Sequence, residues 1–391
     1  MTCIICKNEV EEIMNLGMQP VCNKFLKSKD ERENKYPLIM GLCKKCGLVQ
    51  LINPFPAEEL QPKYEWVTYT EPEEHLDNVA DILAKLSSTS ICGISFKDDS
   101  LLERMKKHGS KTMRLDLQND LGVDNGGVET VQRMLDTSKA RSIVKQNGKF
   151  DIVIARHILE HAYDLKEFIA ALKELAKEDG YIMFEVPDCT KPFEERDYST
   201  VWEEHLVYFT PETFRNCFAY YGLEVERFEL YHYPLENSLV AIVKNKNVNP
   251  KFPYEGALAK ENNRTLGFSK EFVETKNKVN TFFSDFKKNG KITVFGAGHT
   301  ACTLINIFEL EDYIDYVIDD NANKQELLMP GSHIPIRSSS VLLGNDIKLS
   351  VFSLNPRVEG KIIAKNEEFV KKGGKFLSFC PISKYSIIKN V

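Results

Sequence analysis

Two pairs of cysteines near the N-terminus have the spacing of a metal site. Cys3 and Cys6 form one Cys-x-x-Cys pair, and Cys43 and Cys46 form the other. Four thiolates complete the tetrahedral sphere of a zinc ion and leave no open position for a reacting water. We therefore predict a structural zinc site; the alternatives are a coincidence of spacing or a redox dithiol, which needs only one pair. Cys22 lies between the pairs and is expected to be a buried thiol.

A run of polar residues follows an apolar segment and has side chains suited to binding or acid–base chemistry. Phe150–Ala155 has the composition of a buried strand, and its polar continuation contains Arg156, His157, Glu160 and His161. Open α/β sheets bind ligands beyond the carboxyl ends of their strands, so both histidines are expected to face a crevice. A structural role for these histidines is the alternative.

The turn that begins at Gly93 is a candidate cofactor loop. It continues through Ser95, Asp98 and Asp99, and Asp116 follows the next predicted strand. Many methyltransferases bind S-adenosylmethionine at such a turn, where glycines let the backbone approach the ligand and a later acid binds the ribose. Here Ser95 and Asp99 occupy positions where glycines are usual. The predicted cofactor contacts are Gly93, Ser95, Asp98, Asp116, Arg156 and His157. An ordinary strand-to-helix turn is the alternative.

A second glycine-containing turn lies in the C-terminal quarter of the chain. Gly296 and Gly298 follow a predicted strand and open a predicted helix, and Asp319 ends the next strand. This pattern is typical of a dinucleotide site, with Ala301 in place of the third glycine. His299 is placed to meet a phosphate, since helix N-termini favour anions. The alternative is a fold element that holds no ligand.

The elements that must position these residues alternate between strands and helices. Strands are expected at 89–94, 112–115, 150–155 and 181–186, with a helix at 165–176. A second series has strands at 291–295, 314–318, 349–353 and 375–379 and a helix at 300–308. Such alternation predicts parallel sheets covered by helices on both faces. Between the two series, Phe268, Phe272, Val279 and Phe282 recur at helical intervals, which predicts one or two linking helices.

The predicted fold class is α/β, with a small N-terminal module and two Rossmann-like domains. We place a zinc-binding module at 1–60, a class I methyltransferase-like domain at 61–248, a helical linker at 249–289 and a C-terminal Rossmann-like domain at 290–391. Hydrophobic residues make up 42% and charged residues 28% of the 391 residues, which suits globular domains with cores of their own.

Charge and apolar patterning bound the function. The formal net charge of -6 argues against nucleic-acid binding, which usually shows a basic stripe. Apolar runs fall short of the roughly 18 residues of a membrane helix, and the first residues lack the features of a signal peptide. We expect no membrane partner and a cytoplasmic location. Ten cysteines in a reducing compartment favour metal binding and buried thiols over disulfides.

Across nearly its whole length the chain resembles the nucleotide-linked deoxysugar C-methyltransferases, which methylate C3 of a 4-keto sugar. The most specific segments are Trp202–Thr210, which contains Glu-His-Leu, and Pro330–Ile336, which reads Pro-Gly-Ser-His-Ile-Pro-Ile. Other matching segments lie at 15–20, 36–38, 42–51, 155–161, 185–188, 296–298, 319 and 324–325. The resemblance implies S-adenosylmethionine and structural zinc as cofactors and a nucleotide sugar as substrate. It also implies a site that one chain completes, as a monomer or weak homodimer.

The resemblance further implies catalytic roles. His205 matches the base that removes a proton beside the ketone, and Glu204 matches the group that positions this base or tunes its pKa. His161 matches a contact to the keto or enolate oxygen, which needs donors when it becomes negative. Trp202 stands where the family usually has a tyrosine. A solvated polar pair at a turn is the alternative for Glu204 and His205.

Substrate contacts are implied on both sides of an inter-domain crevice. Tyr64 or Trp66 is expected to complete the catalytic site, followed by Val67-Thr68 where the family often has two serines. On the C-terminal side the expected contacts are Gly296, Gly298, His299 and Asp319. Two other functions stay open at this point: an enzyme that modifies a nucleotide sugar without S-adenosylmethionine, and a non-catalytic binding protein on the same scaffold.

Overall fold

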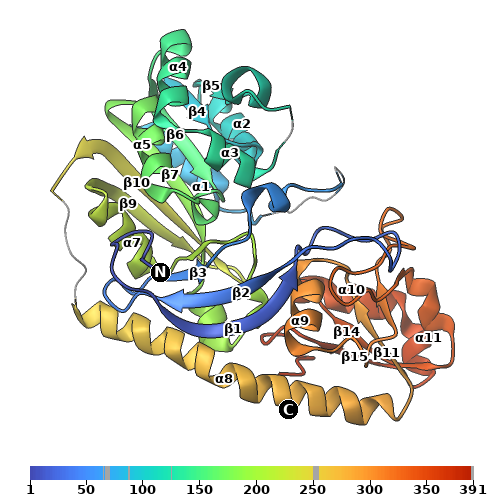
Figure 1. Ribbon diagram of the computed structural model, residues 1–391. Coiled ribbons are helices and arrows are strands. Elements are labelled where there is room, and N and C mark those ends of the chain that lie inside the picture. The colour runs from blue at the N-terminus through green and yellow to red at the C-terminus, as the bar shows by residue number, and fades with distance from the viewer. Residues whose placement is uncertain (65, 67–70, 87–88, 125, 250–254, 389–391) are drawn as a thin grey trace.

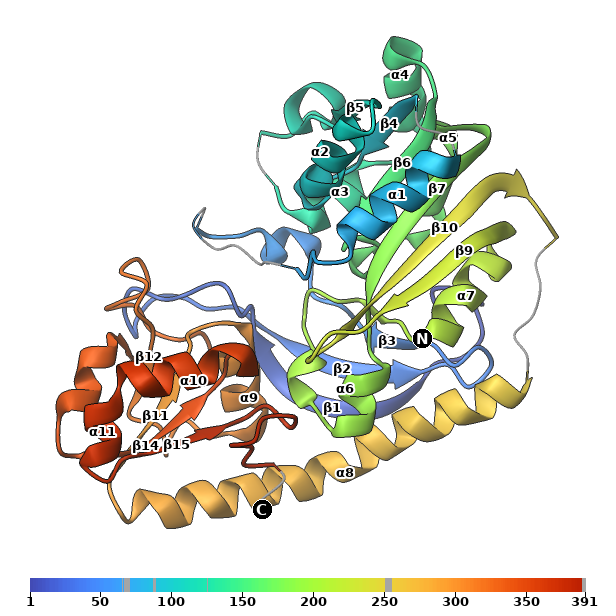
Figure 2. The same ribbon diagram turned by 180° about the vertical axis from the view of Figure 1, so that it is seen from behind.

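The computed structural model describes residues 1–64, 66, 71–86, 89–124, 126–249 and 255–388. It contains an N-terminal sheet and two α/β domains, which meet around a common centre (Figure 1). One long helix, α8 (Glu255–Lys287), runs beneath the N-terminal sheet from the first α/β domain to the second, as the view from behind also shows (Figure 2). Val67 and Thr68 lie outside the described residues. Within the described ranges, no helix is both long and apolar enough to cross a membrane.

The N-terminal sheet is antiparallel and includes a strand from the middle of the chain. Its order is β1 (Glu11–Pro20), β2 (Lys35–Leu42), β3 (Val49–Ile52) and β8 (Val207–Tyr208). β8 begins two residues after His205 and pairs with β3. The Leu51 amide donates to the Leu206 carbonyl at 2.9 Å, immediately beside that strand. The cysteine module therefore fixes the position of the segment that carries Glu204 and His205.

The first α/β domain has a six-stranded mixed sheet. Its order is β5 (Lys111–Arg114), β4 (Ser90–Gly93), β6 (Phe150–Arg156), β7 (Ala176–Asp188), β10 (Asn237–Asn247) and β9 (Leu223–Tyr231). The strands from β5 to β7 are parallel, whereas β10 is antiparallel to both of its neighbours. The sequence predicted parallel pairing only. A short connection joins β9 to β10 without a crossover helix, and such a connection can only join antiparallel strands.

Helices cover both faces of this sheet. One face packs against α4 (Thr137–Asn147), α5 (Leu165–Leu175) and α7 (Pro211–Tyr220), and the other against α1 (Leu76–Leu86) and α2 (Asp99–Lys107). Shorter helices are α3 (Val128–Met134), α6 (Thr190–Glu195), η2 (Phe96–Asp98), η3 (Leu117–Leu121), η4 (Leu159–His161) and η5 (Tyr198–Thr200). The helix expected at 165–176 corresponds to α5, whose apolar stripe (Leu165, Phe168, Ile169, Leu172 and Leu175) is buried.

The C-terminal domain has a five-stranded parallel sheet. Its order is β13 (Ile336–Arg337), β12 (Tyr316–Ile318), β11 (Lys291–Phe295), β14 (Ile347–Phe352) and β15 (Lys375–Ser378). Its helices are α9 (His299–Phe308), η6 (Ser339–Leu343), α10 (Pro356–Lys365) and α11 (Glu367–Lys371). The remaining element, η1 (Ala57–Leu60), ends the N-terminal module.

The link between the domains is one helix. Phe268, Phe272 and Val279 of α8 are buried, as their spacing predicted, but the fourth buried position is Phe283 rather than Phe282. The buried positions follow one regular helical stripe, and Phe282 packs partly buried against the same cluster, next to Phe283. The buried residues of α8 join the N-terminal sheet and the C-terminal domain in one hydrophobic cluster.

Candidate functional site

The four predicted zinc ligands come together at the edge of the N-terminal module. The Cys3 and Cys46 sulfurs are 3.6 Å apart and the Cys6 and Cys43 sulfurs 3.4 Å apart, and all four lie within 4.8 Å of one another. A tetrahedral zinc ion with Zn–S bonds of about 2.3 Å places its sulfurs about 3.8 Å apart. The arrangement fits a four-thiolate zinc ion. Cys22 is a buried thiol elsewhere in the core, 3.3 Å from a carboxylate oxygen of Glu203.

A cavity of about 910 Å³ lies where the two α/β domains meet. Loops that follow β4, β6 and β7 form its wall on one side, and the start of α9 with loops that follow β14 and β15 forms the other. Among the residues predicted from the sequence, the cavity is lined by Tyr64, His157, His161, Trp202, Glu204, His205 and His299. Strand ends of both domains therefore open onto one space, where α/β folds bind ligands.

His161 and His205 form a pair inside this cavity. Their rings are perpendicular with centroids 4.8 Å apart. Burial, followed by the nearby positive charge of His161, lowers the pKa of His205 well below its usual range. Burial also opposes a charge on His161, but Glu129 Oε1, 2.9 Å from Nδ1, outweighs it and raises the pKa of His161. Adjacent histidines whose pKa values are pushed apart are suited to act as a base and an acid.

Glu129 is a functional candidate that the sequence did not reveal. It lies in the first turn of α3 and is buried against His161. Its only local signal is a glycine pair, Gly126-Gly127, which precedes the helix and lines the cavity with it. A single glutamate on a short helix has no spacing that marks it, because its partner histidine is 32 positions away in the chain and meets it only in the fold.

Glu204 is buried and faces the N-terminal module. Asn23 Nδ2 donates to its Oε1 at 2.9 Å, and its carboxylate lies within 4.8 Å of those of Glu129 and the ring of His161. Burial, with Glu129 and Glu203 nearby, raises the pKa of Glu204 well above its usual range. Glu204 thus accepts a hydrogen bond from Asn23, another cavity residue that sequence reasoning missed.

Trp202 lies between histidines of the two domains. Its ring is stacked on His299 at 4.3 Å between centroids and tilted against His205 at 5.0 Å. His299 Nε2 donates to the Ser199 carbonyl at 2.8 Å, and its Nδ1 accepts from Thr303. Burial lowers the pKa of His299 to about 4, so this ring is neutral. Trp66 lies next to the cavity wall, where it stacks on Tyr64 with centroids 4.9 Å apart.

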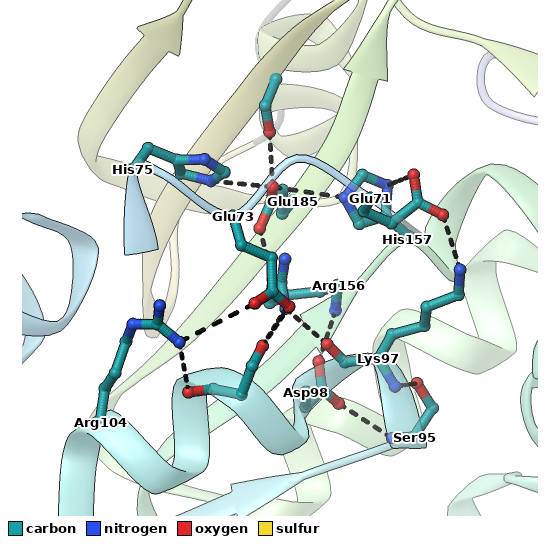
Figure 3. A network of polar contacts seen from close by, with 12 residues as sticks. Glu71, Glu73, His75, Ser95, Lys97, Asp98, Arg104, Arg156, His157 and Glu185 are labelled. Carbon is teal, nitrogen blue, oxygen red and sulfur yellow. Dashed lines mark hydrogen bonds and ion pairs between the residues drawn. The ribbon is translucent and has the colours of Figure 1, made fainter. Parts of the chain in front are cut away.

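The predicted cofactor turn is closed by its own side chains (Figure 3). Asp98 accepts hydrogen bonds from the amides of Ile94 (2.7 Å), Ser95 (2.9 Å) and Arg156 (2.9 Å). Ser95 Oγ accepts from the Lys97 amide at 3.2 Å. Burial raises the pKa of Asp98 to about 7. These amides are therefore occupied from within, and the side chains of Phe96 and Lys97 line the cavity in their place.

A buried ion network lies behind this turn (Figure 3). The Glu185 carboxylate of β7 accepts a hydrogen bond from Arg156 Nε at 2.5 Å. It also pairs with His75 Nε2 at 2.9 Å and His157 Nε2 at 3.3 Å. Burial raises the pKa of Glu185, but Arg156 and His157 outweigh it and hold the pKa well below its usual range. Arg156 is thus a structural member of the network, whereas the imidazole of His157 also lines the cavity.

The other predicted contacts of the two turns lie away from the cavity wall. Gly93 is required by packing, since an added Cβ would meet Leu102 at 2.8 Å and Asp98 at 2.9 Å. Asp116 is exposed at the end of β5 and caps η3 by accepting from the Asn119 amide. Asp319 accepts from the Ala297 amide at 3.0 Å and from Lys324 Nζ at 2.9 Å.

The glycines of the C-terminal turn serve its packing and helix start. Gly296 has φ 109°, and an added Cβ would meet Leu354 at 2.5 Å. Gly298 is the N-cap residue of α9. The turn is therefore the start of a tightly packed α/β unit, and its residue that lines the cavity is His299.

Three family models match consecutive parts of the chain. They describe a zinc binding domain at residues 3–60, a methyltransferase domain at 97–227 and a C-methyltransferase C-terminal domain at 245–381. The three models follow one another along the chain and together match most of it. The chain is an S-adenosylmethionine-dependent methyltransferase with a zinc module, which confirms the fold class and the two cofactors expected from the sequence.

A curated relative and several solved structures are similar to this C-methyltransferase. C-methyltransferase NovU of Streptomyces niveus shares 22% identity over 398 residues, covering 96% of this chain and 94% of that protein. A 1,6-didemethyltoxoflavin-N1-methyltransferase of Burkholderia thailandensis has 12% identity, a TM-score of 0.31, and covers 45% of this chain and 80% of its own. A SAM-dependent methyltransferase of Aquifex aeolicus has 13% identity, a TM-score of 0.30, and covers 45% and 94%.

The cavity has groups that suit S-adenosylmethionine. Glu160 is 1% exposed, and neither of its carboxylate oxygens has a hydrogen-bond partner among the described residues. A buried carboxylate that has no hydrogen bond within the described part of the chain, only an ion pair with His157 at 3.7 Å, favours a further cationic group, such as the ammonium or sulfonium of this cofactor. Lys97 and His157 offer positive charge beside it for a carboxylate. The donor set of the cavity therefore fits the charges of the cofactor.

Proposed function

We propose that this C-methyltransferase methylates the carbon beside the ketone of a nucleotide-linked keto-deoxysugar through an enolate. The observation that carries the proposal is the His161–His205 pair, with its opposite pKa shifts, inside a cavity shared by both α/β domains. Carbon methylation beside a ketone needs one group that removes a proton and another that stabilises the negative oxygen. The two histidines supply both groups, with ring centroids 4.8 Å apart.

His205 is the base in this proposal. Its lowered pKa keeps the imidazole neutral near neutral pH, so it can accept the proton from the carbon. The His205 amide donates to the Trp202 carbonyl at 3.1 Å, and β8 holds the chain on the other side. A base anchored on both sides along the backbone keeps its ring in one place during proton transfer.

His161 stabilises the developing enolate oxygen. Glu129 raises the pKa of His161 and so favours the protonated ring, whose Nε2–H, on the side away from Glu129, donates a hydrogen bond to the substrate oxygen. A preorganised donor in a buried site contributes more than the same donor in water. Glu204 acts indirectly. It accepts a hydrogen bond from Asn23 and lies beside Glu129 and His161, where it positions the two histidines.

S-adenosylmethionine supplies an electrophilic methyl group on sulfur, which the carbon of the enolate attacks. We place the cofactor on the β4 side of the cavity, against Phe96, Lys97, His157 and Glu160. Asp116, at the end of β5, caps η3 outside the cavity and is not among the contacts of this position. Gly93, Ser95, Asp98 and Arg156 contribute by shaping the turn and its ion network rather than by lining the cavity.

The nucleotide sugar lies toward the C-terminal domain in this proposal. Tyr64, Trp202 and His299 offer aromatic surface there, which suits stacking against a base or an apolar sugar face. Trp66 supports Tyr64 from behind. Gly296, Gly298 and Asp319 fix the start of α9 and so the position of His299. One chain provides every group named, so a monomer is sufficient for the site.

Proton exchange tests the base without methyl transfer. The keto sugar is incubated with enzyme and S-adenosylhomocysteine in D2O, and deuterium at the carbon beside the ketone is followed by NMR. The wild type should catalyse exchange, and His205→Ala should not, while S-adenosylhomocysteine still binds in calorimetry. Unchanged exchange and methylation in His205→Ala would overturn the assignment. Exchange retained by His205→Ala but lost in His161→Ala would move the base to His161.

A further inference from the structure

The cavity contains a cation pair that is held by a carboxylate of the chain itself. Lys97 Nζ lies 2.6 Å from Glu71 Oε1, and His157 Nδ1 lies 3.9 Å from Glu71 Oε2. All three residues line the cavity (Figure 3). Glu71 comes from the segment before α1, and the two cations come from the ends of β4 and β6. The carboxylate therefore bridges the two strand ends beside which the cofactor is placed.

The three residues of this group carry charges of opposite sign. Burial opposes ionisation of His157, but Glu71, Glu160 and Glu185 surround the ring and raise its pKa to about 10. Burial likewise disfavours the anion of Glu71, but His157 and Lys97 lower its pKa to about 2. His157 is thus a cation at neutral pH, and Glu71 is the anion that lies between it and the ammonium of Lys97.

Three backbone amides of the turn after β4 are already used within the chain. The amides of Ile94 and Ser95 donate to Asp98, and the Lys97 amide donates to Ser95 Oγ. Side-chain donors are therefore the better partners for a carboxylate that enters the cavity near this turn. Lys97 stands in this turn, with its side chain 11% exposed and its ammonium in the cavity.

We propose that Lys97 and His157 bind the α-carboxylate of the methionine part of S-adenosylmethionine, and that Glu71 occupies the same place until the cofactor displaces it. The proposal rests on the cofactor position given above. A carboxylate of the chain and a carboxylate of the ligand cannot share one cation pair without repulsion. Glu71 then competes with the cofactor carboxylate for the cation pair. Lys97 is the residue that makes the site specific for a ligand with that carboxylate.

The inference makes predictions of opposite sign for two partners of one ion pair. Lys97→Met removes the cation and should weaken S-adenosylmethionine binding about tenfold or more, because a buried charge pair loses one member. Glu71→Gln removes the competitor and should strengthen binding about threefold or more. If the ion pair served stability alone, both substitutions would lower stability, and neither would raise affinity.

Calorimetric titration with two probes isolates the carboxylate. The probes are S-adenosylmethionine and its decarboxylated form, which lacks only that group. Wild type should prefer S-adenosylmethionine about tenfold or more, Glu71→Gln should widen this preference, and Lys97→Met should abolish it. Lys63→Met is the matched control, since Lys63 lines the same cavity but bonds the Phe25 carbonyl and Glu31, and it should leave the preference unchanged.

Each outcome has a meaning. Tight binding of both probes with equal affinity by wild type would overturn the inference and leave the cofactor position intact. Unchanged preference in Lys97→Met would do the same. Binding of neither probe by folded wild type, checked by circular dichroism, would instead overturn the cofactor position on which the inference rests. If Lys97→Met fails to fold, the rise in affinity expected of Glu71→Gln decides alone, and its absence counts against the inference.

Discussion

The two α/β domains close their first turn in the same way but present different surfaces to the shared cavity. Asp98 accepts the turn amides of the first domain, and Asp319 accepts an amide of the second. Beyond the turn the first domain contributes titratable strand ends, such as His157 and His161. Apart from the neutral His299, the second contributes uncharged side chains there, from Thr300, Ser353, Leu354, Asn355, Phe379 and Cys380.

This difference shows that a glycine-containing turn does not by itself distinguish the domain proposed to react from the other domain, because both domains have one. In both turns an aspartate of the chain accepts backbone amides, those of Ile94 and Ser95 in the first domain and that of Ala297 in the second. Titratable groups with shifted pKa values, such as His157 and His161, instead line the cavity beyond a later strand, β6. The first domain would thus react and the second would shape the space.

The largest expected effect on the rate comes from comparing one cavity histidine of each domain, His205 and His299. His205→Ala should lower kcat about 10³-fold, the usual contribution of a general base, with S-adenosylmethionine affinity retained. His299→Ala, the matched substitution in the second domain, should lower kcat/KM less than about tenfold because its neutral ring only forms part of the wall. Initial rates of methylation measure both. Equal losses would contradict the division between a reacting and a shaping domain.

Loss of zinc should affect the first domain through β8. Cys43→Ser should reduce bound zinc from about one per chain, lower the unfolding midpoint, and lower kcat about 10²-fold as His205 loses its anchor on β3. Metal analysis, thermal unfolding and rates are measured on one preparation. Cys380→Ser is the control, because this cysteine lies on the C-terminal side and outside the cluster. Full activity without zinc would show that β8 holds its place unaided.

The Glu129–His161 pair should set the basic limb of the pH profile. His161 must be charged, so its raised pKa preserves activity above pH 6.5 and activity falls as pH rises through that pKa. Glu129→Gln should lower kcat about 30-fold and move this limb to lower pH, whereas Glu129→Asp should restore part of both. The acid limb belongs to His205 and lies below pH 6.5, since its pKa is lowered.

The groups that face His161 make the shift specific to Glu129. Glu160 adds to the raised pKa and Lys97 opposes it, and both remain in the variant. Gln132→Ala is the structural control: its amide bonds the Glu129 carbonyl and the Tyr163 amide, so it loosens α3 without removing the carboxylate. This variant should lose stability but keep the basic limb. A shift of the limb in Gln132→Ala would assign the effect to helix packing.

The smallest effect on the kinetics is expected from the uncharged residues with which the C-terminal domain lines the cavity. Asn355→Ala should raise KM for the nucleotide sugar about threefold and leave kcat and the pH profile unchanged, because its uncharged amide only lines the cavity. Steady-state kinetics at saturating S-adenosylmethionine measure both parameters. A fall in kcat with unchanged KM would give the second domain a part in the reaction and remove the contrast.

Much of the fold could be predicted because its signals are local. Alternating apolar runs marked the strands near 91, 152, 183, 293 and 350, and the helical stripe of α5 matched its buried face. The pairing of β9 with β10 was missed, since strand direction depends on the length of a connection rather than on composition. Phe282 was chosen over Phe283 because adjacent phenylalanines lie near one helical stripe, and only the packing decides which of them is buried.

The candidate site was predictable only where its residues stand next to each other in sequence. His157 and His161 follow one strand, and Glu204 and His205 are neighbours, so motifs revealed them. Glu71, Glu129 and Asn23 have no such context and were missed, although each meets a cavity group in the fold. Asp98 and Asp319 were expected to face ligands, yet their oxygens bond amides of the chain.

By itself the sequence determined the zinc ligands, the order of the domains and the histidines that could react, because residue type and short spacing decide these. Tertiary structure alone decided which charges meet. It brought Glu129 to His161, placed Glu71 between Lys97 and His157, and filled the cofactor turn with Asp98. Ionisation depends on burial and on neighbours within a few ångströms, and the chain supplies those neighbours from positions far apart in sequence.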